Sequence, residues 1–140
     1  MRAIVAGGGL VGEQVARALQ SAGHETVIVE QDRARAAELT AAGHRVVTGN
    51  ACVSEVLEAA SALRSDVLVA CTPRDEENLL VCFVAKRHLE LPRTVARVND
   101  DTNLWLFDDA WGVDAALSWP AALAALVGEP AARVHRDLRP

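Results

Sequence analysis

Short apolar runs recur along the chain and indicate buried strands. The run Val67-Leu68-Val69-Ala70 is apolar at successive positions, which is typical of a parallel strand covered by helices on both faces. Similar runs predict six strands, over residues 2–6, 26–30, 45–48, 66–71, 94–98 and 113–117. Strands that are apolar on both faces require a layer of helices above and below the sheet.

The segments between these runs have the period of helices. After the first strand, the apolar residues that share one helix face are Val11, Val15, Ala18, Leu19 and Ala22. Gly23 and Gly43 are helix stop signals, and Asp32 and Asp75 are expected to be the N-caps of the second and fourth helices. The inward stripe of the fourth helix is expected to comprise Leu79, Leu80, Phe83 and Val84.

Glycines link the first strand to the first helix as Gly7-Gly8-Gly9-Leu10-Val11-Gly12. Glu30 ends the second strand. Strand, glycines, helix, strand and acid in this order form the dinucleotide-binding fingerprint, although the glycines alone are weak evidence. We therefore predict an α/β fold with a Rossmann-like, doubly wound parallel six-stranded sheet in the strand order 3-2-1-4-5-6 and right-handed crossovers.

Each glycine of the fingerprint has a separate task. Gly7 permits the tight turn, Gly9 lets the backbone approach a pyrophosphate, and Gly12 lets the helix pack closely on the strand. The helix that follows offers free N–H groups and a positive dipole to the phosphates.

Glu30 is expected to accept hydrogen bonds from both ribose hydroxyls of an adenosine nucleotide. A 2′-phosphate would meet like charge there, which favours NAD over NADP. Arg33 weakens this preference, because an arginine nearby could accommodate a 2′-phosphate.

Two further turns follow strands at the edge where open α/β sheets bind ligands. Asn50, in Thr48-Gly49-Asn50-Ala51, could bond an adenine edge, and Thr72, in Cys71-Thr72-Pro73, could contact ribose or phosphate. Turn chemistry alone would also select these residues, so both interpretations stay open.

Composition narrows the class of protein. The 140 residues fit one domain, over residues 1–128, with a basic tail over residues 129–140. A net charge of −5 argues against nucleic acid as a partner. No apolar run approaches the roughly 20 residues that cross a bilayer, so we expect no membrane insertion. The thiols Cys52, Cys71 and Cys82, never spaced as CxxC, fit a cytoplasmic location.

Catalytic chemistry is hard to find in the sequence. The histidines His24, His44, His88 and His135 stand far apart and fit surface or capping roles better than catalysis. Tyrosine is absent, which excludes a Tyr-Lys proton relay. Asp100 and Asp101 fit a helix start better than a cation site. We expect no catalytic set and no metal site.

Several segments together resemble the N-terminal domain of the regulator of potassium conductance family, also called the TrkA-N domain. They are residues 4–12, 23–24, 27–30 with Asp32, 48–51, Thr72 with Asp75, Asn78 and Leu79, residues 96–100 and residues 112–114. Arg97-Val98-Asn99-Asp100 and Gly112-Val113-Asp114 are more diagnostic than the glycines.

The resemblance implies a cytoplasmic regulatory subunit or domain that binds NAD(H) or an adenine nucleotide, with ADP, AMP and ATP as alternatives to NAD. Such domains form homodimers or larger homo-oligomers, and they couple ligand state to a membrane-embedded potassium transporter or channel at the inner face of the membrane. The residues expected to bind the nucleotide are Gly7, Gly9, Leu10, Val11, Gly12, Glu30, Gln31, Asn50, Ala51, Thr72 and Arg97.

The chain departs from the family pattern in three places. Leu10 stands where some members carry a basic residue that contacts phosphates, which makes ATP less plausible than NAD or ADP. Asn50 replaces a common aspartate. The chain ends soon after the sixth strand, without the second, ligand-sensing domain of many members, and residues 121–127 with the basic tail resemble the start of a crossover helix.

Two other functions stay open. One is a small NAD-dependent oxidoreductase, or the cofactor half of one. The other is an oligomerisation module with a vestigial nucleotide site. The residues Trp105, Trp111 and Trp119 could pack in the core or form a contact between subunits.

Overall fold

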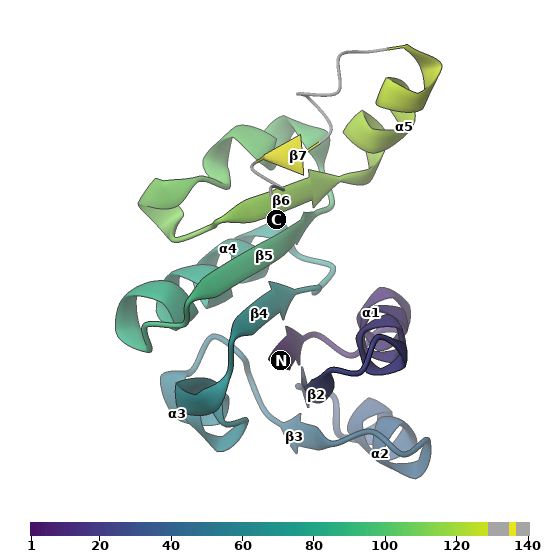
Figure 1. The fold of residues 1–140 in the computed structure, drawn as a ribbon, viewed down its shortest axis with the longest axis vertical. Coiled ribbons are helices and arrows are strands. Elements are labelled where there is room, and N and C mark those ends of the chain that lie inside the picture. Colours follow the sequence, from purple (N-terminus) through teal and green to yellow (C-terminus); the bar gives the residue numbers. More distant parts are fainter. Residues whose placement is uncertain (129–134, 137–140) are drawn as a thin grey trace.

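A computed structural model describes residues 1–128 and 135–136 (Figure 1). The strands are β1 (Arg2–Ala6), β2 (Glu25–Glu30), β3 (Val46–Thr48), β4 (Val67–Ala70), β5 (Arg93–Val98), β6 (Ala115–Ser118) and β7 (His135–Arg136). The α-helices are α1 (Leu10–Ser21), α2 (Arg33–Ala41), α3 (Ser54–Ala59), α4 (Asp75–Phe83) and α5 (Trp119–Val127). Short 3-10 segments are η1 (Ala62–Arg64), η3 (Asp101–Leu106) and η4 (Asp109–Trp111), and a π-helical segment, η2 (Val84–His88), extends α4.

The sheet has the predicted topology. Its order is β3-β2-β1-β4-β5-β6-β7, and the first six strands of that order are parallel. This confirms the doubly wound Rossmann-like fold. The unpredicted β7 pairs antiparallel with β6 through His135 and Arg136. The tail is expected to begin a crossover helix. Apart from β7, its residues 129–134 and 137–140 lie outside the described residues.

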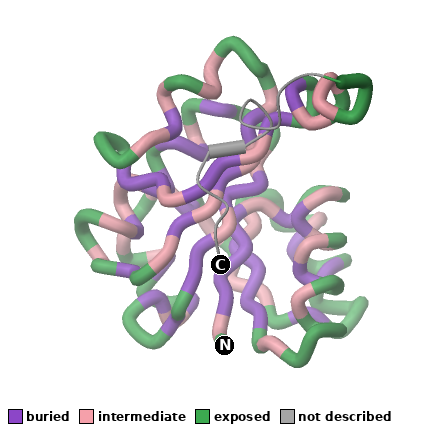
Figure 2. Tube along the Cα trace, turned by 45° about the horizontal axis from the view of Figure 1, so that its top comes forward, coloured by how far each residue is buried: buried purple, intermediate pink, exposed green. Residues whose placement is uncertain are grey.

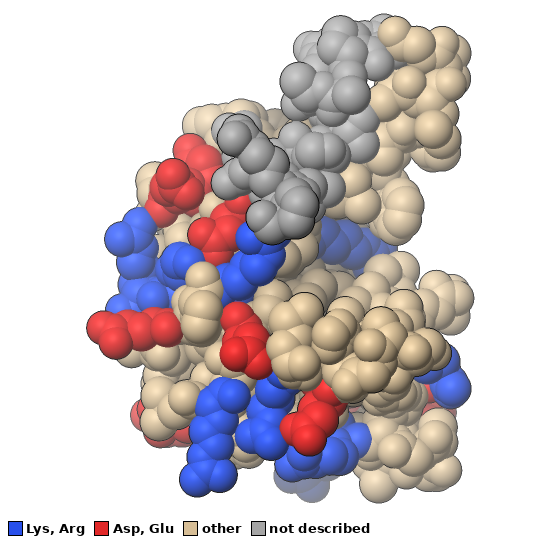
Figure 3. All heavy atoms as spheres, in the orientation of Figure 1, with Lys and Arg blue, Asp and Glu red and all other residues tan. Residues whose placement is uncertain are grey.

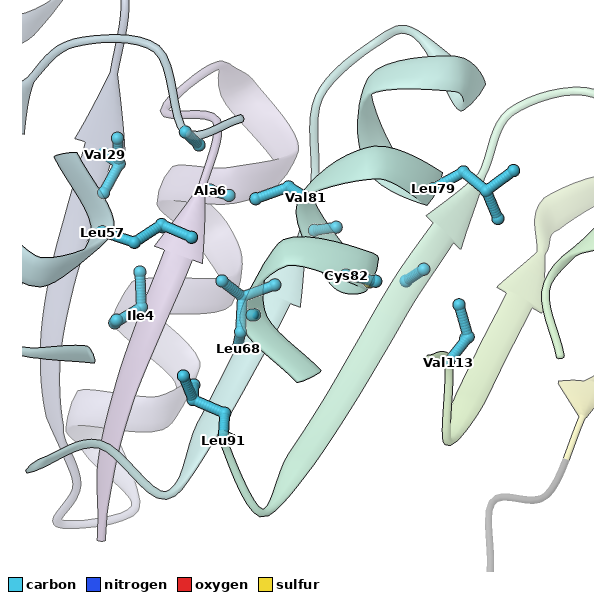
Figure 4. Close-up of a cluster of buried hydrophobic side chains, with 14 of the residues drawn as sticks. Ile4, Ala6, Val29, Leu57, Leu68, Leu79, Val81, Cys82, Leu91 and Val113 are labelled. Atoms are coloured by element: carbon cyan, nitrogen blue, oxygen red, sulfur yellow. The ribbon is translucent and has the colours of Figure 1, made fainter. Parts of the chain in front are cut away.

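Helices cover both faces of the sheet, with α1 and α2 on one side and α3 and α4 on the other (Figure 1). The larger core lies under α3 and α4, where Ile4, Leu57 and Leu68 are fully buried (Figure 4). The smaller core lies under α1 and α2 and includes Val5 and Ile28. Because adjacent strand residues enter opposite cores, the strands are buried on both faces, and Figure 2 shows this as a purple sheet between green outer surfaces.

Two local predictions for α4 are wrong. Arg74, not Asp75, occupies the N-cap position, because the Asp75 carboxylate turns away to bond the loop after β5. Leu80 is 43% exposed, whereas Leu79 is buried as predicted. The buried face of α4 also carries Asn78, Val81 and Cys82. The inward stripe thus differs from the predicted one at Leu80, and it includes a polar side chain, Asn78.

The C-terminal part exposes apolar side chains. Of the two alternatives left open for the tryptophans, core packing does not apply to Trp105 and Trp119, which are 68% and 50% exposed. Trp111 is 39% exposed and packs edge-on against Phe83, with ring centroids 5.7 Å apart. The apolar α5 projects beyond the end of β6 and is the uncharged region at the upper right of Figure 3. On the left and in the lower part of that view, acidic and basic side chains are interspersed. Among the described residues, no helix has the length and apolar character needed to cross a membrane.

Candidate functional site

A cavity of about 330 Å³ lies at the carboxyl ends of the central parallel strands. Of the residues predicted to bind a nucleotide, those that line it are Gly7, Gly9, Glu30, Gln31, Asn50, Ala51 and Thr72. Those that do not line it are Leu10, Val11, Gly12 and Arg97. The remaining walls come from Val29, Asp32, Arg35, Gly49, Cys52, Cys71, Pro73, Glu77 and Val81.

The glycines of the loop differ in what surrounds them. Gly7 has φ +102°, and a Cβ there would lie 3.0 Å from the Cys71 carbonyl carbon and the Thr72 nitrogen. A Cβ at Gly12 would collide with the Gly7 carbonyl oxygen. A Cβ at Gly9 would have no described atom within 4 Å. Gly7 and Gly12 are therefore required by the fold, whereas Gly9 leaves space where a ligand could approach the backbone.

The N-cap residue of α1 lines the cavity. This residue is Gly9, and it makes no side-chain hydrogen bond to the helix N–H groups. An uncapped helix N-terminus combines free donors with a positive partial charge, which suits a phosphate. Leu10 begins the helix but is 72% exposed and adds no charge to the cavity.

Glu30 lies at the tip of β2, where the sequence places it. One carboxylate oxygen accepts from the Gly8 nitrogen at 3.0 Å, and the other accepts from the Asp32 nitrogen at 2.7 Å. The side chain is thereby fixed between the glycine loop and the start of α2. Each oxygen keeps a further lone pair for a ribose hydroxyl.

Arg35 lines the cavity and was not found from the sequence. Its Nε donates to the Gly8 carbonyl oxygen at 2.7 Å, and its other nitrogens bond Glu13 and Glu38. Arg33, which the sequence suggested as a 2′-phosphate partner, instead lines a groove along α2. Arg35 therefore braces the glycine loop, and of these two arginines it is the one that lines the cavity.

Glu13, a partner of Arg35, belongs to a partly buried network of hydrogen bonds. Glu13 accepts from His44 Nε2 at 3.0 Å as well as from Arg35 and Arg17. The hydrogen bond from His44, followed by that from Arg35, lowers the pKa of Glu13. Of the surface or capping role expected for His44, the surface role is wrong, because the side chain is buried. The network ties α1 to the start of β3 and to α2.

The loop after β3 forms the far wall of the cavity. Asn50 Oδ1 accepts from the Cys52 nitrogen at 2.9 Å, which closes a tight turn. Its amide NH2 has no such role in the turn and is the group that could donate to a base. Burial, together with the charge of Glu77, raises the pKa of the Cys52 thiol.

Asn78 fixes the loop after β4 through hydrogen bonds. Its Oδ1 accepts from both the nitrogen and the hydroxyl of Thr72, and its Nδ2 donates to the carbonyl oxygens of Thr72 and Arg97. Asn78 is fully buried. The Thr72 hydroxyl is therefore engaged inside the loop, although Thr72 itself lines the cavity.

Asp75 fixes the loop after β5 through hydrogen bonds. Its carboxylate accepts from the backbone nitrogens of Asn99 and Asp100 and from the amide groups of Asn99 and Asn103. Burial raises the pKa of Asp75, but these hydrogen bonds outweigh it, so the pKa lies below its ordinary value. Both loops at this edge of the sheet are thus held by side chains from the first turn of α4.

The Gly-Val-Asp segment has a structural role at the opposite end of β5. Asp114 accepts from Lys86 Nζ at 2.7 Å and from the Thr94 nitrogen at 2.8 Å, while the Thr94 hydroxyl bonds the Gly112 carbonyl oxygen. Asp100 caps η3, and Asp101 accepts from the Ser118 hydroxyl, so both carboxylates take part in hydrogen bonds of the fold. Within the described residues, no cluster of three or more acidic, histidine or cysteine side chains could hold a metal ion.

A family model described as the TrkA-N domain matches residues 3–119. The chain belongs to the TrkA-N domain family. A curated relative, the Trk system potassium uptake protein TrkA of Mycobacterium tuberculosis, is 44% identical over 131 residues. The alignment covers 92% of this TrkA-N chain but 59% of the relative's length. The relative is thus considerably longer than the segment it shares.

Solved structures have the same fold. The TrkA-N domain of the inner membrane protein ybaL from Escherichia coli superposes with a TM-score of 0.81 at 23% identity, covering 90% of this chain and 93% of that one. A structure of the GsuK channel bound to NAD gives a TM-score of 0.73 at 21% identity, covering 86% of this chain and 21% of that one. At these identities the likeness concerns the fold.

Proposed function

We propose that this TrkA-N domain binds an adenine nucleotide, with NAD preferred, and regulates a membrane-embedded potassium transporter or channel. The observation that carries the proposal is the cavity where the open Gly9, the uncapped start of α1 and the Glu30 carboxylate meet. These groups suit a pyrophosphate and an adenosine ribose at adjacent positions.

The potassium partner is supported by the family. A curated relative carries the name of a Trk potassium uptake protein, and a channel, GsuK, contains a domain of this fold. As a cytoplasmic subunit or domain, the protein would act by binding its nucleotide more tightly in one arrangement of paired domains than in another. Exposed Trp105 and Trp119 favour such pairing, because large apolar side chains on a surface suit a homo-oligomer contact.

Calorimetric titration with NAD, NADH, ADP and ATP, followed by an assay of NADH turnover with small carbonyl compounds, tests the nucleotide part. We expect binding without turnover. Turnover of NADH would favour the hypothesis of an oxidoreductase. If no adenine nucleotide bound, the hypothesis of an oligomerisation module with a vestigial site would remain. The transport part of the proposal is tested by the uptake of rubidium, as a substitute for potassium, into cells that lack the protein. Introducing the wild-type protein should restore uptake. Uptake in cells that carry Gly9→Asp should not respond to the nucleotide.

Glu30→Gln is expected to weaken NAD binding about tenfold, because the amide cannot accept from both Gly8 and Asp32 and loses charge-assisted bonds to ribose. It should also narrow the preference for NAD over NADP, since the charge that repels a 2′-phosphate is removed. Titration of both dinucleotides measures the two effects. Glu25→Gln, at the other end of β2, is the matched control. An unchanged NAD affinity in Glu30→Gln would show that this carboxylate does not hold the ribose.

A further inference from the structure

Glu77 is an acidic residue in the wall of the cavity that the dinucleotide-binding fingerprint does not include. It belongs to the first turn of α4 and lines the cavity together with Val81, one helical turn further on. Its side chain is 36% exposed, and its ion pair with Arg74 Nε spans 3.9 Å, which is too long for a hydrogen bond. Arg74 pairs more closely with Glu76, at 2.7 Å. The Glu77 carboxylate is thus available to a ligand.

The turn of α4 that carries Glu77 contacts the loop after β3. The Cys52 thiol donates to the Glu77 carbonyl oxygen, with 3.9 Å between sulfur and oxygen, and the charge of the Glu77 carboxylate contributes to the raised pKa of that thiol. The Cys52 nitrogen in turn donates to Asn50 Oδ1 at 2.9 Å. Cys52 therefore links Glu77 to Asn50, and all three residues line the cavity.

This part of the wall lies beyond the expected ribose. β3 pairs with the end of β2, where the Gly49 nitrogen donates to the Glu30 carbonyl oxygen at 2.9 Å. The loop that carries Asn50 therefore starts beside Glu30, on the side of β2 away from β1. On the proposed nucleotide site, a ribose at Glu30 with its phosphate at Gly9 directs the base toward Asn50 and Glu77.

The two polar side chains there provide one donor and one acceptor. Asn50 Oδ1 is engaged in its own turn, so the side chain offers its NH2 group as a donor, whereas the Glu77 carboxylate is an acceptor. Adenine presents the complementary pair, because its 6-amino group donates and N7 on the same edge accepts. Guanine and hypoxanthine carry a carbonyl oxygen at position 6, which a carboxylate repels.

We infer that Glu77 accepts a hydrogen bond from the 6-amino group of the bound base and thereby selects adenine over hypoxanthine and guanine. This role rests on the proposed nucleotide site, since it requires a base in the cavity. Ala51 and Val81 supply apolar parts of the wall, which suit the faces of a purine ring. The charge of Glu77 strengthens the hydrogen bond from an amino group and increases the penalty for a carbonyl oxygen.

Titration calorimetry with NAD and with nicotinamide hypoxanthine dinucleotide, in which a carbonyl oxygen replaces the 6-amino group, tests this role. The wild type should bind NAD at least about tenfold more tightly than the hypoxanthine analogue. In Glu77→Gln this ratio should fall about tenfold, because the amide can accept from an amino group or donate to a carbonyl oxygen. ADP and IDP should give the same change, since they differ only in the base.

Glu76→Gln is the matched control. Glu76 shares the first turn of α4 with Glu77, so both variants remove a negative charge near the same helix N-terminus, but Glu76 does not line the cavity. The base preference of Glu76→Gln should equal that of the wild type. The melting temperature of each ligand-free variant should lie within about 3 °C of the wild-type value, because both side chains are partly exposed.

The other results overturn different parts of the inference. If the wild type bound NAD and the hypoxanthine analogue equally, or if Glu77→Gln kept the wild-type ratio, Glu77 would not read the base, although the nucleotide site would stand. An equal fall of the ratio in Glu76→Gln would assign the effect to the charge of the helix start and overturn the contact with the base. If the wild type bound neither dinucleotide and neither ADP nor IDP, the nucleotide site itself would be overturned, and the role of Glu77 with it.

Discussion

Gly9→Asp is expected to abolish nucleotide binding while the protein stays folded. The Cβ position of Gly9 has no described neighbour within 4 Å, so the aspartate side chain fits without displacing the protein. Its carboxylate would lie where the first phosphate of the nucleotide approaches the N-terminus of α1. Two anions in contact repel each other strongly. We expect affinity for NAD to fall at least about a hundredfold, which corresponds to about 2.7 kcal/mol. Titration calorimetry measures the affinity, and circular dichroism checks the fold.

Gly9→Ala is the matched control for the charge. Alanine adds bulk at the same position without a charge, so the variant should retain more of the NAD affinity than the aspartate variant. If Gly9→Asp bound NAD as the wild type does, the phosphates would not lie at this loop. If it failed to fold, the open space at Gly9 would be misassigned.

Asn78→Leu is expected to cause the largest loss of stability at the site. Leucine has a similar size, but at this fully buried position it leaves the Thr72 nitrogen and the Arg97 carbonyl oxygen without the Asn78 partner, whereas the Thr72 carbonyl oxygen keeps its bond from Asn99 Nδ2. Each orphaned group costs about 1–3 kcal/mol, so we expect a loss of about 3 kcal/mol in the free energy of unfolding, or about 10 °C in melting temperature. Urea denaturation measures the free energy.

Two further variants separate the hydrogen bonds from general disturbance of the helix. Asn78→Asp keeps the acceptor for Thr72 but loses the two donated bonds, so it should also lower stability. Leu80→Ala, on the exposed side of α4, should change stability by less than about 1 kcal/mol. An Asn78→Leu variant as stable as Leu80→Ala would show that the loops after β4 and β5 do not depend on this side chain.

The sequence predicts the fold well because its strongest signals are local or periodic. Apolar runs and glycine stops define the parallel strands to within two residues at their ends. The glycines of the loop identify the turn at Gly7, since the close approach to Cys71 and Thr72 requires a residue without Cβ. Glu30 follows from its position at the end of β2.

The rest of the site depends on contacts between residues far apart in the chain. Arg35 reaches Gly8 across 27 positions, and no local pattern reveals that bond. Asp75 has the local signature of an N-cap, but it bonds Asn99 and Asp100, which only the folded chain brings near. Leu80 satisfies the helical period, yet it is 43% exposed, whereas the polar Asn78 is buried. Tertiary hydrogen bonds thus override local preference where the loops are held.

Native mass spectrometry of the protein incubated with NAD tests the central claim most directly, because it reports bound ligand and subunit number together. We predict one NAD per subunit in the wild type, an even number of subunits, and loss of bound NAD in Gly9→Asp under the same conditions. Subunits that carry no NAD, ADP, AMP or ATP at saturating concentration would contradict a nucleotide site at the glycine loop.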